Sequence, residues 1–283
     1  MHQSKRLDDT FRIPHGRAAT LAAAYVLAIA CGGDDKTSLT KTAAAASQRS
    51  VVSTGDVVIK PPVAPYTVAP VASPGTITGA IVIKGALSPL PPAATGRDST
   101  ICGPDIPDES VRLQGGGLSG VVVWLEGTRS GKPLGLERRI ELESSKCRLR
   151  PRVQAAVVGS AVNILGHDEF RERLNFSAGG ETAPRAAVLL GGGEQVIPTE
   201  LPFRAPGMVT IQDAEHAWPR AWIAVFDHPY FAVSGVGGTF TIDGVPPGKY
   251  TLHAWHERAA ASAQEVDVGA NGQLKVAVEL TPR

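Results

Sequence analysis

The chain has 283 residues, of which 43% are hydrophobic and 19% are charged, so it can bury a core and is not globally disordered. Its 28 basic residues barely exceed its 27 acidic ones, and this balance argues against nucleic-acid binding, which needs a basic surface. The 31 glycines, 22 prolines and 5% aromatic residues favour short strands joined by turns over a helical bundle.

Residues 1–30 have the pattern of an export signal. Basic residues precede an apolar run, 18–30, that is too short to cross a bilayer as a helix. The run ends in Leu-Ala-Ile-Ala followed by Cys31. This ending resembles the lipobox of bacterial lipoproteins, although that family prefers Leu where this chain has Ala28. Cleavage of an ordinary signal peptide beside an incidental cysteine is the alternative.

The lipobox resemblance implies a location and a membrane partner. Cys31 would carry lipid as the mature N-terminus and anchor the chain in the bacterial cell envelope. Gly32, and not Asp, follows the cysteine, so we expect the outer membrane, facing the periplasm or the cell surface. Residues 31–74, rich in Ala, Ser and Pro, would form a linker between anchor and folded part. Envelope or respiratory proteins would be the protein partners.

Beyond residue 74, short apolar or alternating stretches separated by Gly and Pro predict β-strands. They lie at 76–83, 121–125, 153–158, 161–165, 208–212, 221–226, 239–242, 249–255 and 273–280. Helix patterns are weak in this part of the chain. Short strands at this spacing indicate an all-β chain built as antiparallel sandwiches.

The stretch 238–252 carries the first family resemblance. It reads Gly-Thr-Phe-Thr-Ile-Asp-Gly-Val-Pro-Pro-Gly-Lys-Tyr-Thr-Leu and resembles the carboxypeptidase-regulatory-like (transthyretin-like) β-sandwich. The opening strand of that family resembles 75–81, and its next strand resembles 119–125. Because these matches lie at both ends of the chain, the resemblance implies one sandwich split between 75–146 and 232–283.

The insert between them, residues 147–231, is similar to a plastocyanin-like cupredoxin. The segments that carry this similarity begin at Cys147, Gly159, Asp168, His216, Arg220 and His228, with a further match at Trp255-His256-Glu257. The combination of the two modules resembles envelope proteins described as methylamine-utilisation-like. It implies a degenerate cupredoxin-like Greek-key sandwich joined to the first one.

The copper ligands of the cupredoxin family are largely replaced. A type 1 site takes two His, a Cys thiolate and a weak axial Met. The resemblance places Glu172, Asp213 and Pro219 at three of these positions and leaves His216 alone, so no copper and no other cofactor is expected. Glu172, Asp213 and His216 could instead form a weak residual site for a divalent ion such as Zn(II) or Cu(II). The simpler interpretation is that they are solvated surface residues, with the charged run 171–173 in a loop.

Cys102 and Cys147 are the two cysteines that remain once Cys31 carries lipid. In an oxidising envelope two such thiols most simply form a disulfide. Paired metal thiolates would need neighbouring His or Cys, and neither cysteine has them.

The sequence contains no Gly-x-Ser-x-Gly elbow, no His-Glu-x-x-His helix and no phosphate loop. We therefore expect a protein that is not an enzyme and acts as a binding or assembly module in the envelope. A metal-handling or electron-transfer protein of the cupredoxin type is the first alternative. A carbohydrate-binding module is the second, because tryptophans can stack on sugars. Three of the four tryptophans lie in apolar runs, however, and are expected in the core.

Overall fold

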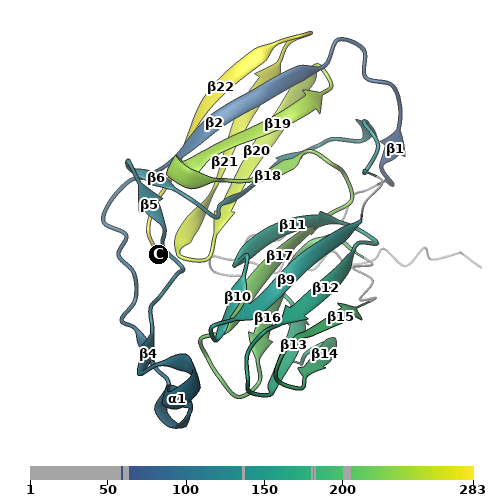
Figure 1. Cartoon of the computed structure of the whole chain (residues 1–283). Helices are drawn as coiled ribbons and strands as arrows, with labels where there is room; N and C mark the ends of the chain where they lie inside the picture. The colour runs from purple at the N-terminus through teal and green to yellow at the C-terminus, as the bar shows by residue number, and fades with distance from the viewer. Residues whose placement is uncertain (1–58, 60–63, 136–137, 180, 182, 200–204) are drawn as a thin grey trace, which may run out of the picture. The chain divides into compact units, whose positions relative to one another are not determined.

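The computed structural model describes residues 59, 64–135, 138–179, 181, 183–199 and 205–283. The predicted signal peptide, the lipidation site Cys31 and most of the predicted linker lie outside these residues, so these remain predictions. The described chain is nearly all β, as expected, and its one α-helix is the short α1 (Ser99–Cys102) (Figure 1). No helix in the described part is long and apolar enough to cross a membrane.

The first sandwich is built from both ends of the described chain. One sheet has the order β18 (Phe231–Val233), β7 (Val122–Glu126), β20 (Gly248–His256) and β21 (Ala259–Val268). The other has the order β19 (Thr239–Val245), β2 (Gly75–Ile83), β6 (Gly117–Leu118) and β5 (Leu113–Gln114), and β22 (Gln273–Leu280) pairs in parallel with β2. Ile77, Leu125 and Ile242 lie in the core between these sheets.

Two local features shape the turn that joins β19 to β20. Gly244 takes a φ of 65°, a value that side chains other than glycine rarely adopt. The hydroxyl of Tyr250 then donates to the carbonyl of Pro246 at 2.8 Å and holds the Pro-Pro-Gly turn. On the neighbouring strand, Gly79 leaves space for the ring of Phe240, since an added Cβ would lie 2.5 Å from it.

The second sandwich also consists of two sheets. One has the order β10 (Arg148–Arg150), β9 (Arg139–Ser145), β12 (Ala161–Gly166) and β15 (Gln195–Thr199). The other has the order β11 (Val153–Val157), β17 (Arg220–Phe226), β16 (Gly207–Asp213), β13 (Glu172–Ala178) and β14 (Ala186–Leu190). Two pairs, β9 with β12 and β11 with β17, run in parallel, and the other neighbours are antiparallel. Leu142, Ile164 and Ile223 are fully buried between the sheets.

The boundaries differ from those predicted. The second sandwich begins with β9 and not at Cys147, because Leu142 of β9 packs in its core. The end of the predicted linker also packs on the folded chain. Ile59 is buried, and β1 (Thr67–Val68) pairs with β8 (Ser130–Gly131). The apolar and β-branched side chains of this stretch explain why it does not behave as a spacer.

A third apolar cluster contains residues of both sandwiches. It includes Trp124 and Trp255 from the first and Met208 and Phe226 from the second. The rings of Trp255 and Trp222 meet edge to face with centroids 5.2 Å apart. The prediction that these tryptophans pack in apolar surroundings is confirmed: Trp124 and Trp255 are buried, and Trp222 is partly buried against them.

Residues 84–112, which we call the crossover segment, run between β2 and β5. They contain β3 (Ala93–Ala94), the 3₁₀ turn η1 (Gly96–Asp98), α1 and β4 (Asp105–Ile106). The predicted disulfide is confirmed: Cys102 of this segment is bonded to Cys147, with their Cα atoms 5.6 Å apart. A segment that starts and ends in the first sandwich is therefore covalently attached to the second.

Candidate functional site

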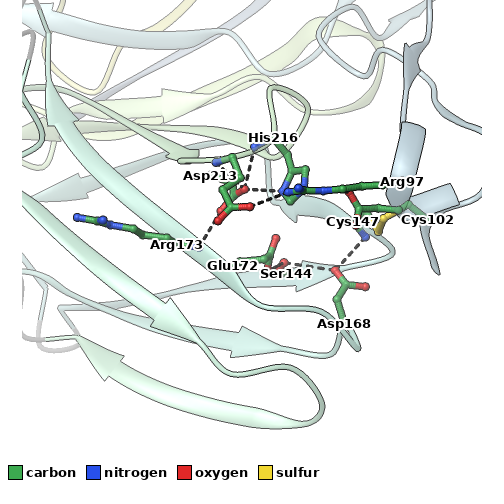
Figure 2. Close-up of polar contacts among 11 residues, drawn as sticks. Arg97, Cys102, Ser144, Cys147, Asp168, Glu172, Arg173, Asp213 and His216 are labelled. Atoms are coloured by element: carbon green, nitrogen blue, oxygen red, sulfur yellow. Dashed lines mark hydrogen bonds and ion pairs between the residues drawn. A yellow bond between two sulfur atoms is a disulfide. The ribbon is translucent and has the colours of Figure 1, made fainter. Parts of the chain in front are cut away.

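Glu172, Asp213 and His216 come together at one end of the second sandwich (Figure 2). Glu172 is the first residue of β13, Asp213 is the last of β16, and His216 lies in the turn that leads to β17. They are only 2%, 3% and 7% exposed. The expectation of solvated residues was wrong, and so was that of a loop at 171–173, because Glu172 starts an antiparallel strand that pairs with β14 and β16.

The carboxylate of Asp213 organises the turn. Its Oδ1 accepts the backbone N–H of Arg173 at 2.7 Å, and its Oδ2 accepts the backbone N–H groups of Glu215 (3.1 Å) and His216 (2.9 Å). Asp side chains favour turns because they bond to backbone a few residues on. The same Oδ2 also lies 2.6 Å from Nδ1 of His216, so the turn fixes the imidazole as well.

The imidazole of His216 is held on both sides by carboxylates. Its Nδ1 faces Asp213, and its Nε2 lies 3.1 Å from Oδ2 of Asp98 in the crossover segment. The ring also contacts Phe170 edge to face at 5.5 Å and Trp218 at 4.8 Å between centroids. A metal binds imidazole through a nitrogen lone pair. In this arrangement both nitrogens are already engaged in hydrogen bonds.

Glu172 has a different environment. One of its oxygens accepts the hydroxyl of Ser144, which is fully buried, and the other, Oε1, is buried with no hydrogen-bond partner among the described residues. Burial raises the pKa of Glu172 to about 7, and the nearby carboxylates of Asp168 and Asp213 act in the same direction. Glu172 can therefore carry a proton near neutral pH.

The crossover segment covers this end of the sandwich. Besides Asp98, it contributes Arg97, whose Nη2 lies 2.8 Å from Oε2 of Glu215. The disulfide is adjacent, and the backbone N–H of Cys147 donates to Asp168 at 2.9 Å (Figure 2). Sequence reasoning missed Asp98, which is 118 residues from His216. The pairing of Cys102 with Cys147 was the one signal that could have placed the crossover segment here.

The donor set differs from that of a type 1 copper site. In the described part of the chain, no three His, Cys, Asp or Glu side chains are arranged to hold a metal ion. Both nitrogens of His216 lie within hydrogen-bond distance of a carboxylate oxygen, and Oδ2 of Asp213 already accepts two backbone N–H groups. The soft sulfur ligands of a type 1 site are absent from the positions of Asp213 and Pro219.

Two other buried histidines have structural roles. Nδ1 of His228 accepts the backbone N–H of Tyr230, and Nδ1 of His256 accepts that of Arg258, both at 3.2 Å. Burial lowers the pKa of each to about 4, so both are neutral at physiological pH. A third histidine, His253, is near the surface with its Nε2 2.6 Å from a carboxylate oxygen of Glu126.

Comparison with solved structures finds similarity to copper proteins over about a third of the chain. One is a copper-containing nitrite reductase from Thermus scotoductus SA-01, which is 19% identical over 35% of this chain and 24% of its own, with a TM-score of 0.25. Two are single-residue variants of amicyanin in the Cu(I) form. They are 21% and 18% identical over 31% and 36% of this chain and 81% and 97% of their own, each with a TM-score of 0.23. The chain thus spans about a quarter of the nitrite reductase. No model of a known family matches the chain, and no curated protein is similar to it.

Proposed function

We propose that this protein is a non-catalytic envelope lipoprotein that acts as a binding or assembly module, and that its second sandwich is a cupredoxin-like domain without a type 1 copper site. The observation that carries the proposal is the position of His216. The one histidine that remains of the expected ligand set has a carboxylate at each ring nitrogen. The contacts with these carboxylates engage both ring nitrogens, the atoms through which a metal ion would have to bind.

The covered end of the sandwich supports the same conclusion. An electron carrier must let a redox partner approach its centre closely. Here Asp98 and Arg97 lie over the turn that contains His216. The disulfide attaches their segment to Cys147, the residue that directly precedes β10. This favours a structural use of the end over electron transfer.

The one hydroxyl at the site does not support catalysis. Ser144 lies beside a carboxylate, as an activated nucleophile would, and its hydroxyl donates to Glu172. Ser144 is fully buried, and Glu172 is 2% exposed. A substrate would have to displace the core of the sandwich to reach either group.

Copper loading tests the proposal. The full-length chain is incubated with Cu(II) and dialysed, and its metal content and electrochemical response are measured. We expect no retained copper and no reversible redox couple. The matched comparison is the variant with Glu172→His, Asp213→Cys and Pro219→Met, which restores the ligand types of a type 1 site and should gain thiolate-to-copper colour. One retained copper per wild-type chain would overturn the proposal and favour the electron-transfer alternative.

A further inference from the structure

Next to the covered end, a cavity of about 170 Å³ lies between the crossover segment and the second sandwich. Ile106, Asp108 and Glu109 line it from the crossover segment. The second sandwich contributes Arg148, Arg152, Trp218 and Arg220. The cavity therefore depends on the same attachment that covers His216, because Cys147 directly precedes Arg148 in the chain.

The charges around the cavity are unequal. The carboxylate of Glu109 pairs with the guanidinium groups of Arg148 and Arg150, at 3.0 and 2.6 Å. Nε and Nη2 of Arg152 donate to the two carboxylate oxygens of Glu257, at 2.6 and 2.8 Å. Asp108 lies 3.5 Å from Arg258. Of the residues that line the cavity, three are arginines (Arg148, Arg152 and Arg220) and two are acidic (Asp108 and Glu109), so one positive charge is in excess.

Arg220 is the arginine without an acidic partner. Its Nε and Nη2 donate to the neutral amide oxygen of Gln212, at 3.1 and 2.7 Å, and no carboxylate of the described residues lies within ion-pair distance of it. A guanidinium that lines a cavity and lacks a counter-ion is suited to a carboxylate, whose two oxygens match its geometry.

Two N–H donors on lining side chains also lack partners. Nε of Arg148 and Nε1 of Trp218 are buried without a hydrogen bond among the described residues. Both atoms have almost no accessible surface, so a ligand in the cavity does not reach them, and the charge of Arg220 carries the assignment.

The remaining walls are apolar. Pro91, Ile106, Pro107 and Leu149 line the cavity together with the ring of Trp218. A cavity of roughly 150 Å³ accommodates a benzene ring. The site therefore combines a cationic part with an apolar part of the size of one small ring.

We propose that this cavity binds a small organic anion, a carboxylate carried on a compact apolar body. Arg220 pairs with the carboxylate, and the ring of Trp218 and the proline, isoleucine and leucine side chains contact the body. This inference rests on the proposed binding role and names the ligand class for it. Because Trp218 also packs against His216, an occupied cavity stabilises the covered end.

Calorimetric titration of the full-length oxidised chain tests this with benzoate as the probe. Benzamide serves as the neutral molecule of the same shape, and inorganic phosphate as an anion with no apolar part. We expect saturable benzoate binding and affinities at least about tenfold lower for both comparison ligands. Equal binding of benzamide would overturn the role of charge, and equal binding of phosphate would overturn the role of the apolar walls. Absence of benzoate binding at about 10 mM would overturn the site.

Variants locate the binding. Arg220→Gln should weaken benzoate binding about tenfold or more, because it removes the charge that pairs with the carboxylate. Arg185→Gln is the matched control, because Arg185 belongs to the same sandwich but pairs with Glu181 outside the cavity. Thermal unfolding shows whether each variant is folded. If Arg220→Gln does not fold, Arg220→Lys gives a second test, since it keeps the charge but removes the planar fork that matches a carboxylate and should weaken benzoate binding by a few-fold.

Unchanged affinity in folded Arg220→Gln, or equal losses in Arg185→Gln, would contradict the assignment. The outcome is separate from that of copper loading. Failure of benzoate to bind would leave a copper-free module intact, and a wild-type chain that retains copper would not affect the benzoate result.

Discussion

Asp98 and His216 lie 3.1 Å apart, Oδ2 to Nε2, although 118 residues separate them in the chain. His216 belongs to a turn of the second sandwich, and Asp98 belongs to a segment that leaves and rejoins the first. The imidazole therefore contacts two carboxylates, that of Asp213 from its own turn and that of Asp98 from the crossover segment. This pair of contacts connects the candidate site with the way the two sandwiches are joined.

The contact between Asp98 and His216 should stabilise the fold. Asp98→Ala leaves Nε2 of a buried imidazole without a partner, and we expect the free energy of unfolding to fall by about 1–3 kcal/mol. The control is Glu215→Ala, which breaks the exposed pair with Arg97 and should change stability little. Urea unfolding measures both. Equal losses of unfolding free energy in the two variants would show that the buried contact stabilises the fold no more than the exposed ion pair does.

The disulfide should contribute more than any single hydrogen bond. It closes a loop of 45 residues, for which the loop-entropy relation gives about 4 kcal/mol. The double change Cys102→Ser and Cys147→Ser should lower the free energy of unfolding by about this amount, and thiol labelling of the oxidised wild type should find neither cysteine free. Two reactive thiols in the native protein, or a double variant as stable as the wild type, would contradict the bridge.

How far the sequence predicts this fold depends on the kind of segment. The strands at 121–125, 249–255 and 273–280 were predicted where β7, β20 and β22 occur, because their residues alternate or form short β-branched runs between turns. The longer strands that were missed include β9, β13, β14, β15 and β21. In β13 a charged residue, Glu172, takes an inward position, which hides the alternation.

The candidate site was predicted in its members and not in its chemistry. Comparison with a known ligand pattern placed Glu172, Asp213 and His216 together. It could not show that they are buried, that Ser144 donates to Glu172, or that Asp98 reaches His216. The contact with Asp98 arises from the crossover segment, which has no periodic pattern. Its position is set by long-range partners, the disulfide and the ion pairs, that local propensity does not encode.

His256 should make stability depend on pH. Burial lowers its pKa to about 4 from an ordinary 6.5, so between these values the unfolded chain binds a proton that the folded chain does not. The stability it contributes is full above about pH 6.5 and is lost as the pH falls towards 4, on the order of 3 kcal/mol in total. His256→Gln should flatten the stability profile in this window. Exposed His167 is the control: its hydrogen bond with Glu194 raises its pKa, so His167→Gln should act above pH 6.5 and leave the slope between pH 4 and 6.5 unchanged.

Cys31→Ala tests the expected lipid anchor. Without the cysteine no lipid can be attached, and we expect the protein to move from the membrane fraction to the soluble envelope fraction. Ser38→Ala in the same stretch is the control and should stay with the membrane. Fractionation followed by immunoblotting measures the change. Unchanged membrane association of Cys31→Ala would mean that something other than lipid holds the chain.

The central claim is that the ring nitrogens of His216 are occupied by Asp98 and Asp213 and are not available to a metal. Nitrogen NMR of the full-length chain with labelled histidine reads these atoms directly, with His216→Gln identifying the signals. Both ring-nitrogen signals of His216 should stay in place when one equivalent of Zn(II) is added, while exposed His167 is free to respond. A large shift of either His216 signal at one equivalent of Zn(II) would show a free lone pair and would contradict the account.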